Sequence, residues 1–355
     1  MRSSGTRGYS GYRGRRPDNR RWVVLVLVLI LIAALAFLAV QRYLVFDKGG
    51  SYHFELPWVR HASPKETGKT GGRSLEIVIE EPEEPGQAPV TEPLHALELD
   101  PSVLQGDMTR TLSALGSGVN SLAIRLKTVD GDLLYPSSLP EAVEAKAVSG
   151  SSMALSAIEA LNASNYYTIA RLSMLHDSRY SFAHMTDAAV LQLSYRNYIW
   201  YAPDSSFYLA PEKELARSYL VNVAREVAAM GFDELLLDEF SYPPSGRLNN
   251  IDASKRDMSM EAALSLLVDQ LRSGLSEYDV CLSLTMEAAD VLAGGNERRG
   301  QSLAQLGNRF DRIYVPCTED QLEALRAAME PYAAELVPIL PAAPAAADGP
   351  YLISE

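Results

Sequence analysis

The sequence contains little of what metal and redox sites are built from. It has 2 cysteines and 5 histidines. Cys281 and Cys317 form no Cys-x-x-Cys motif, and the histidines show no paired ligand spacing, so we expect no metal ion. No glycine-rich phosphate loop follows the first predicted strand, and no Gly-x-Ser-x-Gly elbow is present. The sequence therefore favours a protein without a cofactor and without a serine nucleophile.

Basic residues are scarce beyond the first 21 residues. That segment holds 7 arginines and 1 aspartate, a net +6, whereas the whole chain carries −13, so the remainder carries −19. Binding to phosphate backbones needs clustered lysine and arginine. We therefore expect no nucleic acid partner.

An uncharged apolar run covers residues 22–40, which is about the length that a bilayer core of roughly 30 Å requires of a helix. The arginines before it place the N-terminus in the cytoplasm by the positive-inside rule. We expect a cytoplasmic basic tail at 1–21, a single-pass membrane anchor at 22–42, and an extracellular remainder. The alternative is a cleaved export signal, but no convincing small-residue cleavage site follows the run.

Residues 43–92 are polar and rich in proline and glutamate, as in PKETGKTGG and EEPEEPGQAPVTEP. Such composition keeps a segment extended and disordered. We interpret this segment as a linker between the membrane and a folded domain at 93–355.

From residue 93 onward, short apolar runs alternate with helical patterns, which indicates βα units. The predicted strands are 95–99, 119–126, 166–172, 233–238, 280–286, 312–315 and 335–340, with a less obvious eighth at 351–353. The helical patterns lie at 107–118, 153–164, 212–232, 260–275 and 319–330. This number of units over some 250 residues predicts an α/β fold of the (β/α)8 TIM-barrel type, complete or lacking one strand. An open doubly wound sheet is the competing architecture.

The two cysteines are predicted to be buried free thiols. Cys281 begins one predicted strand and Cys317 follows the end of the next, so they should lie at opposite ends of the sheet, too far apart for a disulfide.

Aromatic residues are concentrated in the long connection 178–212, which follows the third predicted strand. Trp200 and Tyr201 from this connection are candidates for stacking on sugar rings, and Tyr242 after the fourth strand is a further candidate for substrate binding. The alternative is that these rings pack the connection onto the barrel.

Charged residues stand at the carboxyl ends of several predicted strands, where a barrel builds its active site. Asp238 ends the fourth strand with Glu239 beside it, and Glu287 ends the fifth. A pair of carboxylates on neighbouring strands is what glycoside hydrolysis uses, one as acid and one as nucleophile or base. We predict Asp238 as nucleophile or base and Glu287 as general acid, with Glu239 as a further candidate.

Four more polar side chains stand near these strand ends. Arg125 and Lys127 end the second strand, Arg171 lies in the third, and His176 follows it. We predict that they bind substrate, and that Arg171 lowers the pKa of Asp238. The alternative is a cluster of ion pairs that closes the top of the barrel.

Four segments, in order, resemble the "putative glycoside hydrolase" domain of many bacterial envelope proteins. They are VNSLAIRLKTVDGDLLYPSSLP, YYTIARLSMLHD, GFDELLLDEFSYP and GQSLAQLGNRFDRIYVPCTE. The resemblance covers about 93–342. It implies a TIM barrel related in style to α-amylase-type hydrolases and a polysaccharide substrate.

The chain departs from the family pattern inside the implied pocket. Arg125 stands where the family has an acid, Glu239 where it has tyrosine, and Ser241 where it has arginine. The family's Trp-x-Asp-Pro is reduced to Leu209-Ala210-Pro211, whereas Lys127, Arg171, Gly231, Asp233, Asp238 and Pro243 are retained. The leading prediction is a membrane-anchored glycosidase that acts on a cell-envelope or extracellular polysaccharide. The alternative is a catalytically degenerate barrel that binds glycan or envelope proteins as a tethered scaffold.

Overall fold

The structure is a computed structural model that describes residues 44–46, 52–54, 93–116, 118–194, 198–344 and 349–354. The chain divides into two units, Met1–Gly86 and Gln87–Glu355. In the first, β1 (Leu44–Phe46) pairs antiparallel with β2 (Tyr52–Phe54). The other residues predicted as tail, membrane anchor and linker lie outside the described ranges. No helix within those ranges has the length and apolar character needed to cross a bilayer.

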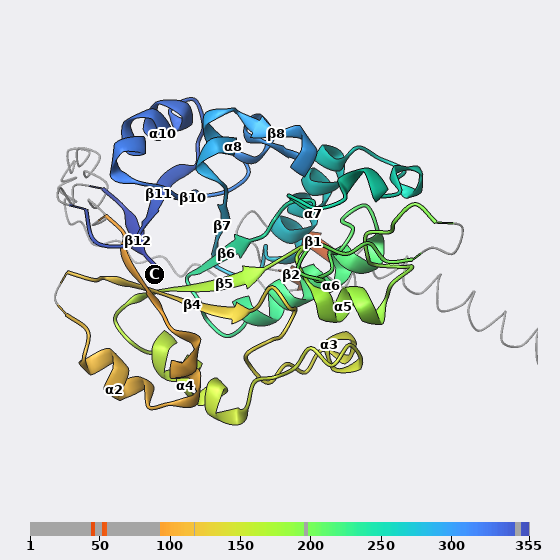
Figure 1. Ribbon diagram of the computed structural model, residues 1–355. Helices are drawn as coiled ribbons and strands as arrows, with labels where there is room; N and C mark the ends of the chain where they lie inside the picture. Colours follow the sequence, from red (N-terminus) through yellow and green to blue (C-terminus); the bar gives the residue numbers. More distant parts are fainter. Residues whose placement is uncertain are drawn as a thin grey trace, which may run out of the picture. The chain divides into compact units, whose positions relative to one another are not determined.

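A closed barrel of parallel strands forms the second unit (Figure 1). Its strands, in chain order, are β3 (His95–Leu99), β4 (Ser121–Lys127), β5 (Tyr167–Ser173), β6 (Glu234–Asp238), β7 (Cys281–Thr285), β10 (Arg312–Pro316), β11 (Glu335–Leu340) and β12 (Tyr351–Ile353). The short β12 pairs with both β11 and β3 and closes the ring. The prediction of a TIM barrel is confirmed, including its eighth strand, and the open doubly wound sheet is wrong.

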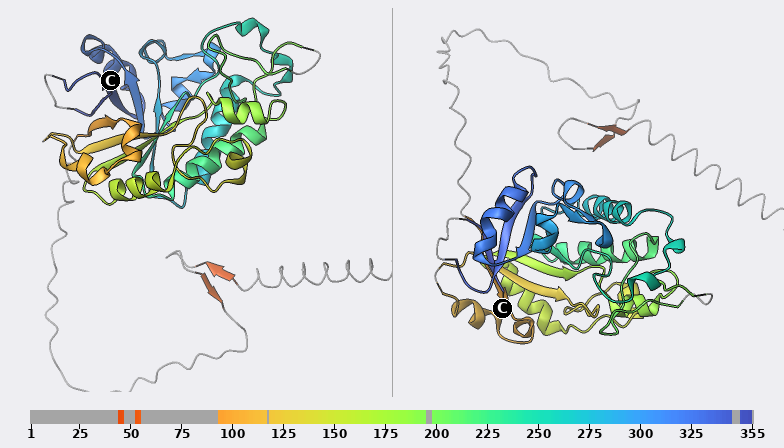
Figure 2. Two further views of the ribbon diagram at one scale, coloured as in Figure 1. Left: turned by 60° about the horizontal axis from the view of Figure 1, so that its bottom comes forward. Right: turned by 45° about the horizontal axis from the view of Figure 1, so that its top comes forward.

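Helices follow most strands and surround the barrel (Figure 2). They are α2 (Met108–Ser113), α3 (Pro140–Glu144), α4 (Ser152–Asn162), α5 (Ser178–Ala183), α6 (Glu214–Ala228), α7 (Met260–Gly274), α8 (Ala288–Leu292), α9 (Leu303–Leu306) and α10 (Leu322–Met329). Short 3-10 turns lie at Pro101–Gln105, Leu248–Asn250, Ala253–Lys255, Glu297–Arg299 and Glu319–Gln321, and a small hairpin pairs β8 (Gly295–Asn296) with β9 (Gln301–Ser302). Helix α7 begins where the Ser259 side chain accepts a hydrogen bond from the Ala262 amide, a regular N-cap.

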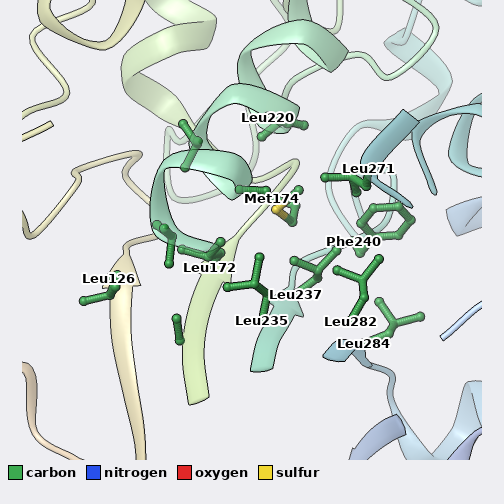
Figure 3. Close-up of a cluster of buried hydrophobic side chains, with 14 of the residues drawn as sticks. Leu126, Leu172, Met174, Leu220, Leu235, Leu237, Phe240, Leu271, Leu282 and Leu284 are labelled. Atoms are coloured by element: carbon green, nitrogen blue, oxygen red, sulfur yellow. The ribbon is translucent and has the colours of Figure 1, made fainter. Parts of the chain in front are cut away.

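Alternation along the strands divides the core in two. In β6 every residue is buried, as its leucine run predicts. Leu236 points into the barrel with Ile169 and Tyr314, whereas Leu235 and Leu237 join the layer between strands and helices (Figure 3). The barrel interior is thus filled by side chains, and polar residues come together only at its ends.

The cysteines are unbridged, as predicted, since Cys281 begins β7 and Cys317 follows β10. Both are only partly buried, which corrects the prediction of buried thiols. Cys281 is the first residue of β7 and Cys317 follows the last residue of β10.

The long connection 178–212 contains α5 and a small core of its own, formed by Val190, Trp200, Ala202, Tyr208 and Ala210. The Tyr180 ring stacks on Tyr219 of α6, with ring centroids 3.8 Å apart. Tyr180, Trp200 and Tyr208 therefore hold the connection together and against the barrel, whereas Phe182, Tyr198 and Tyr201 are exposed.

Candidate functional site

A polar cavity of about 470 Å³ opens at the carboxyl ends of β4 to β7 and β10. We call it the mouth cavity. Its charged lining consists of Arg125, Arg171, Asp238, Glu239, Glu287 and Arg299, and its uncharged lining includes Thr285 and Gln301. The structure therefore brings together all three predicted catalytic carboxylates and two of the predicted substrate-binding residues.

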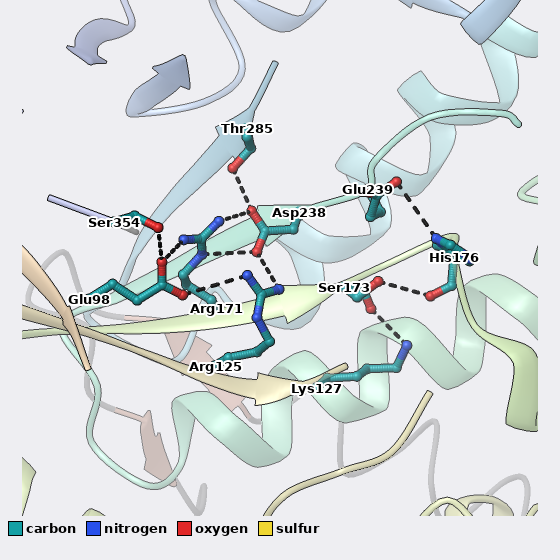
Figure 4. A network of polar contacts seen from close by, with 10 residues as sticks. All are labelled: Glu98, Arg125, Lys127, Arg171, Ser173, His176, Asp238, Glu239, Thr285 and Ser354. Carbon is teal, nitrogen blue, oxygen red and sulfur yellow. Dashed lines mark hydrogen bonds and ion pairs between the residues drawn. The ribbon is translucent and has the colours of Figure 1, made fainter. Parts of the chain in front are cut away.

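The Asp238 carboxylate accepts four hydrogen bonds (Figure 4). Arg171 binds both oxygens, with Nε 3.0 Å from Oδ2 and Nη2 2.9 Å from Oδ1. Arg125 Nη1 lies 3.1 Å from Oδ2, and Thr285 Oγ1 donates to Oδ1 over 2.6 Å. Burial alone would raise the pKa of Asp238, but these partners outweigh it and hold the pKa below its ordinary value. Asp238 is thus an ionised carboxylate fixed in one orientation.

Glu98, at the end of β3, completes the charge network beneath the mouth cavity. Its carboxylate contacts Arg171 Nη1, lies 3.6 Å from Arg125 Nη2, and accepts a hydrogen bond from Ser354 beyond β12. Two carboxylates and two guanidinium groups therefore alternate across the barrel top. This is the ion-pair cluster named above as the alternative to substrate binding, and it contains a residue that the sequence analysis missed.

Glu239 differs from Asp238 in its backbone conformation and in the direction of its pKa shift. Its φ is +51°, in the left-handed region that non-glycine residues seldom adopt, and its carbonyl accepts from the Leu175 amide over 3.1 Å. This turn directs the side chain, 39% exposed, into the mouth cavity. Burial, then the negative charges of Asp238 and Glu287, raise the pKa of Glu239 above its ordinary value.

His176 lies behind Glu239 rather than in the mouth cavity. Its ring is buried, stacks on Tyr208 with centroids 4.3 Å apart, and places Nδ1 4.0 Å from Glu239 Oε2. Nε2 lies 2.6 Å from Ser206 Oγ, which itself donates to Asp204 Oδ1 over 2.6 Å. Because that hydroxyl proton goes to Asp204, Nε2 must be the donor, which leaves Nδ1 unprotonated toward Glu239. Burial lowers the pKa of His176, in agreement with a neutral ring.

Lys127 is fully buried and does not reach the mouth cavity. A bulge in β4 interrupts the register between Arg125 and Lys127 and separates their environments. Lys127 Nζ lies 2.7 Å from Asp177 Oδ2 and donates to the Ser173 carbonyl over 2.7 Å. Its position corrects the prediction of substrate contact: Lys127 anchors the start of the connection after β5.

The opposite wall comes from the segment between β7 and β10. Glu287 precedes α8 as its N-cap residue, and Arg299 Nη1 pairs with Asp290 Oδ2 at 3.1 Å. Gln301 Nε2 donates to the Phe240 carbonyl over 3.1 Å. Sequence reasoning missed Arg299 and Gln301, which lie in the small β8–β9 hairpin and not at the end of a barrel strand. It also missed Thr285, which ends β7 and obeys the strand-end rule.

The predicted sugar-stacking aromatics lie away from the mouth cavity. Trp200 is buried and donates from Nε1 to the Arg247 carbonyl over 3.1 Å, and the 51% exposed Tyr201 lines a separate small cavity with it. Tyr242 is buried, donates to Glu212 Oε2 over 2.6 Å, and lies under the Arg256 guanidinium. For Trp200 the packing alternative is therefore the correct one. The buried contacts of Tyr242, outside the mouth cavity, correct its prediction as a substrate-binding residue.

Within the parts of the chain that the structure describes, no group of three or more histidine, cysteine and carboxylate side chains is arranged to hold a metal ion.

Comparison with known proteins identifies one family. The model of the family described as "Putative glycosyl hydrolase domain" matches residues 107–316, more than half of the chain. No curated protein sequence matches significantly.

Solved structures with a similar chain path include a hypothetical protein from Ruminiclostridium thermocellum, with 20% identity over 53% of this chain and 96% of that one, at a TM-score of 0.47. The glycoside hydrolase domain of PgaB (BpsB) from Bordetella bronchiseptica matches with 15% identity over 70% of this chain and 83% of its own, at 0.44. The glycoside hydrolase domain of PelA from Pseudomonas aeruginosa matches with 12% identity over the same shares, at 0.39. Because every one of these TM-scores is below 0.5, we take no activity or substrate from these likenesses.

Proposed function

Because this chain belongs to the family described as "Putative glycosyl hydrolase domain", we propose that its mouth cavity hydrolyses glycosidic bonds in a cell-envelope polysaccharide. The observation that supports this most is the pair of adjacent carboxyls in that cavity whose pKa values are moved in opposite directions. The pKa of Asp238 is lowered and that of Glu239 is raised. Environments that separate two carboxyls in this way produce one base and one acid at the same pH.

Glu239 is the proposed general acid. It is partly exposed in the cavity, and the nearby charges of Asp238 and Glu287 favour its protonated form. Protonation of the leaving oxygen by such a group contributes about 10²–10⁴-fold to rate. In this proposal Glu287, the acid predicted from sequence, contributes through its negative charge to the raised pKa of Glu239.

Asp238 is the proposed ionised carboxylate, facing the positive charge that develops on the sugar ring. An oxocarbenium-like transition state is stabilised by a fixed negative charge, and the bidentate Arg171 contact fixes this one. Arg125 and Thr285 complete its orientation.

A second function, glycan binding without turnover, is favoured by one specific observation. Four donors already occupy the two oxygens of Asp238, which lowers the basicity and nucleophilicity of the carboxylate. One of these donors, Arg125, stands where the family resemblance implies an acid. In this version the ion-pair network is a rigid floor for a bound sugar.

The test compares hydrolysis and binding with matched variants of the full chain. Envelope polysaccharide is incubated with wild type, Asp238→Asn, Glu239→Gln and Glu287→Gln, and with Glu159→Gln, an exposed carboxylate on α4, as control. We expect release of reducing ends by wild type and the control, and losses of about 10²–10⁴-fold in the Asp238 and Glu239 variants. Equal binding by wild type and Asp238→Asn, without hydrolysis by either, would establish the binding function instead.

General acid catalysis has its own signature. Aryl glycosides with a good leaving group need little protonation, so Glu239→Gln should retain far more activity on them than on polysaccharide. If both substrates lose activity equally, Glu239 is not the acid.

The proposed location is the outer face of a membrane, with the barrel tethered by residues 22–42. The support is the arginine-rich segment before an uncharged apolar run. Protease added to intact cells should degrade a tag after residue 355 and spare a tag before residue 1. Protection of both tags until lysis would reject this topology.

A further inference from the structure

A second, larger cavity of about 620 Å³ lies beside the mouth cavity. We call it the side cavity, and its principal lining residues are Asp132, Glu144, Lys146, Arg179, Phe182 and Phe207. They come from the loop after β4, the end of α3, α5, and the return of the long connection (Figure 1). The mechanism above uses none of them.

The two cavities share one loop. Thr128 and Val129 line the mouth cavity, whereas Asp130 and Asp132 line the side cavity. A chain-like ligand seated in the mouth cavity can therefore continue across this loop into the side cavity.

The shared loop is held in a single conformation. The Thr128 amide donates to the Asp132 carbonyl and the Gly131 amide to the Thr128 carbonyl, both over 3.0 Å. The Arg179 amide then donates to the Asp130 carbonyl over 2.9 Å and ties the loop to α5. The border between the cavities is thus built from backbone hydrogen bonds within the loop and from the loop to α5.

Phe182 presents an exposed aromatic ring to the side cavity. It is 60% exposed, and the Phe207 ring lies near it with centroids 6.0 Å apart. An apolar side chain this exposed contributes little to the free energy of folding, because most of its surface stays in water. A ligand that covers the ring would gain binding free energy from burying that surface. The flat C–H face of a pyranose ring matches such a surface.

Groups that donate and groups that accept hydrogen bonds surround the two rings. Arg179 Nε donates to Asp132 Oδ1 over 3.0 Å, while the Arg179 side chain remains 49% exposed. Glu144 and Lys146 add an exposed acceptor and an exposed donor. Charges of both signs beside aromatic rings suit neutral hydroxyls, which donate and accept, better than a ligand of one charge.

We propose that the side cavity is a second saccharide subsite, which holds sugar units of the same chain whose scissile bond lies in the mouth cavity. The inference rests on the proposed function, because the mouth cavity must hold glycan for the chain to continue into the side cavity. The proposal predicts that longer saccharides bind more tightly than short ones, and that the gain depends on contact with the Phe182 ring.

The test measures binding of two probes to the full chain by calorimetry. The probes are the disaccharide and octasaccharide fractions of a partial acid hydrolysate of the producing organism's envelope polysaccharide. Phe182→Ala should raise the Kd for the octasaccharide about tenfold, because the apolar ring surface that the sugar covers is lost, and should leave the Kd for the disaccharide unchanged. Phe182→Tyr keeps the ring and should retain binding, and Met153→Ala, an exposed apolar side chain on α4, is the control.

The outcomes separate the two proposals. An octasaccharide Kd unaffected by Phe182→Ala overturns the subsite, as does an equal loss for both probes or failure of wild type to bind either. If Glu239→Gln abolishes hydrolysis while Phe182→Ala changes nothing, the proposed activity stands and the subsite falls. If no mouth variant alters turnover but Phe182→Ala still weakens octasaccharide binding alone, the subsite stands on a barrel that binds without hydrolysis.

Discussion

At the scale of single residues, Arg125 is one of the side chains that bind the Asp238 carboxylate. A single substitution can measure how much this contact contributes to the free energy of unfolding. Arg125→Ala leaves Asp238 and Glu98 with Arg171 as their remaining cation, so we expect a loss of about 1–2 kcal/mol in unfolding free energy at pH 7. The folded pKa of Asp238 is depressed, so its contribution is present above the unfolded pKa of about 3.9 and is lost as pH falls through the folded pKa. The difference from wild type should therefore shrink below about pH 4.

Urea unfolding at pH 7 and at pH 3 checks this prediction. Arg110→Ala, which removes an exposed arginine from α2, is the matched control and should change little at either pH. An equal loss for Arg125→Ala at both pH values would mean that Arg125 acts through packing and not through charge.

Glu239 should show the opposite sign. Its folded pKa is raised, so wild type loses stability as pH rises from the unfolded pKa of about 4.3 through the folded one. Glu239→Gln removes the carboxylate charge and should be more stable at pH 7 by less than about 1 kcal/mol, because the side chain is partly exposed. The gain should vanish below about pH 4. Lower stability of the variant at pH 7 would contradict the raised pKa.

At the scale of elements, the shared loop after β4 offers a sharp test. A Cβ at Gly131 would lie 2.1 Å from Asp177 Oδ1, at a φ of +92°, and would displace the carboxylate that neutralises buried Lys127. Disruption of a buried ion pair costs about 3–5 kcal/mol, so Gly131→Ala should destabilise by about that amount in thermal unfolding. Gly231→Ala, at φ +89° with nothing within 4 Å, carries only the backbone strain and should lose about 1 kcal/mol. Equal losses in the two variants would show that the Asp177 contact is unimportant.

Regular elements were predictable because burial imposes a period on the sequence. The predicted strands at 95–99 and 335–340 coincide with β3 and β11. The predicted helices contain α2, α6, α7 and α10, and α4 begins one residue before its predicted start. Loops carry no such period. Trp200 and Tyr242 illustrate this, since each ring turns inward to a specific hydrogen-bond partner that lies more than 25 residues away in sequence.

The site was predictable to the extent that it follows strand ends. The strand-end rule found Asp238, Arg125 and Arg171, because each belongs to a barrel strand and lies toward its carboxyl end. Glu98 obeys the same rule, one residue before the end of β3, but was not predicted. Arg299 reaches the cavity through the irregular segment between β7 and β10, for which the sequence shows no periodic signal.

At the scale of the whole molecule, closure of the barrel joins residues far apart in the chain. Strand β12 completes the ring, Leu352 fills the barrel interior, and Ser354 hydrogen-bonds Glu98 across 256 residues of sequence. The last strand therefore supports both the core and the floor of the mouth cavity. Removal of a core side chain from this strand should therefore affect both the stability of the barrel and the arrangement of Glu98.

Leu352→Ala tests this link between closure and site. Its side chain is fully buried, so the deletion should lower the unfolding free energy by about 2–5 kcal/mol, whereas Leu155→Ala, at a 38% exposed leucine on α4, should lose less than about 1 kcal/mol. Because β12 also positions Ser354 against Glu98, Leu352→Ala should weaken octasaccharide binding even where the protein remains folded. Urea unfolding gives the first quantity and calorimetry below the transition gives the second. A folded variant with unchanged binding would show that the floor of the mouth cavity holds its arrangement through Arg125 and Arg171 alone.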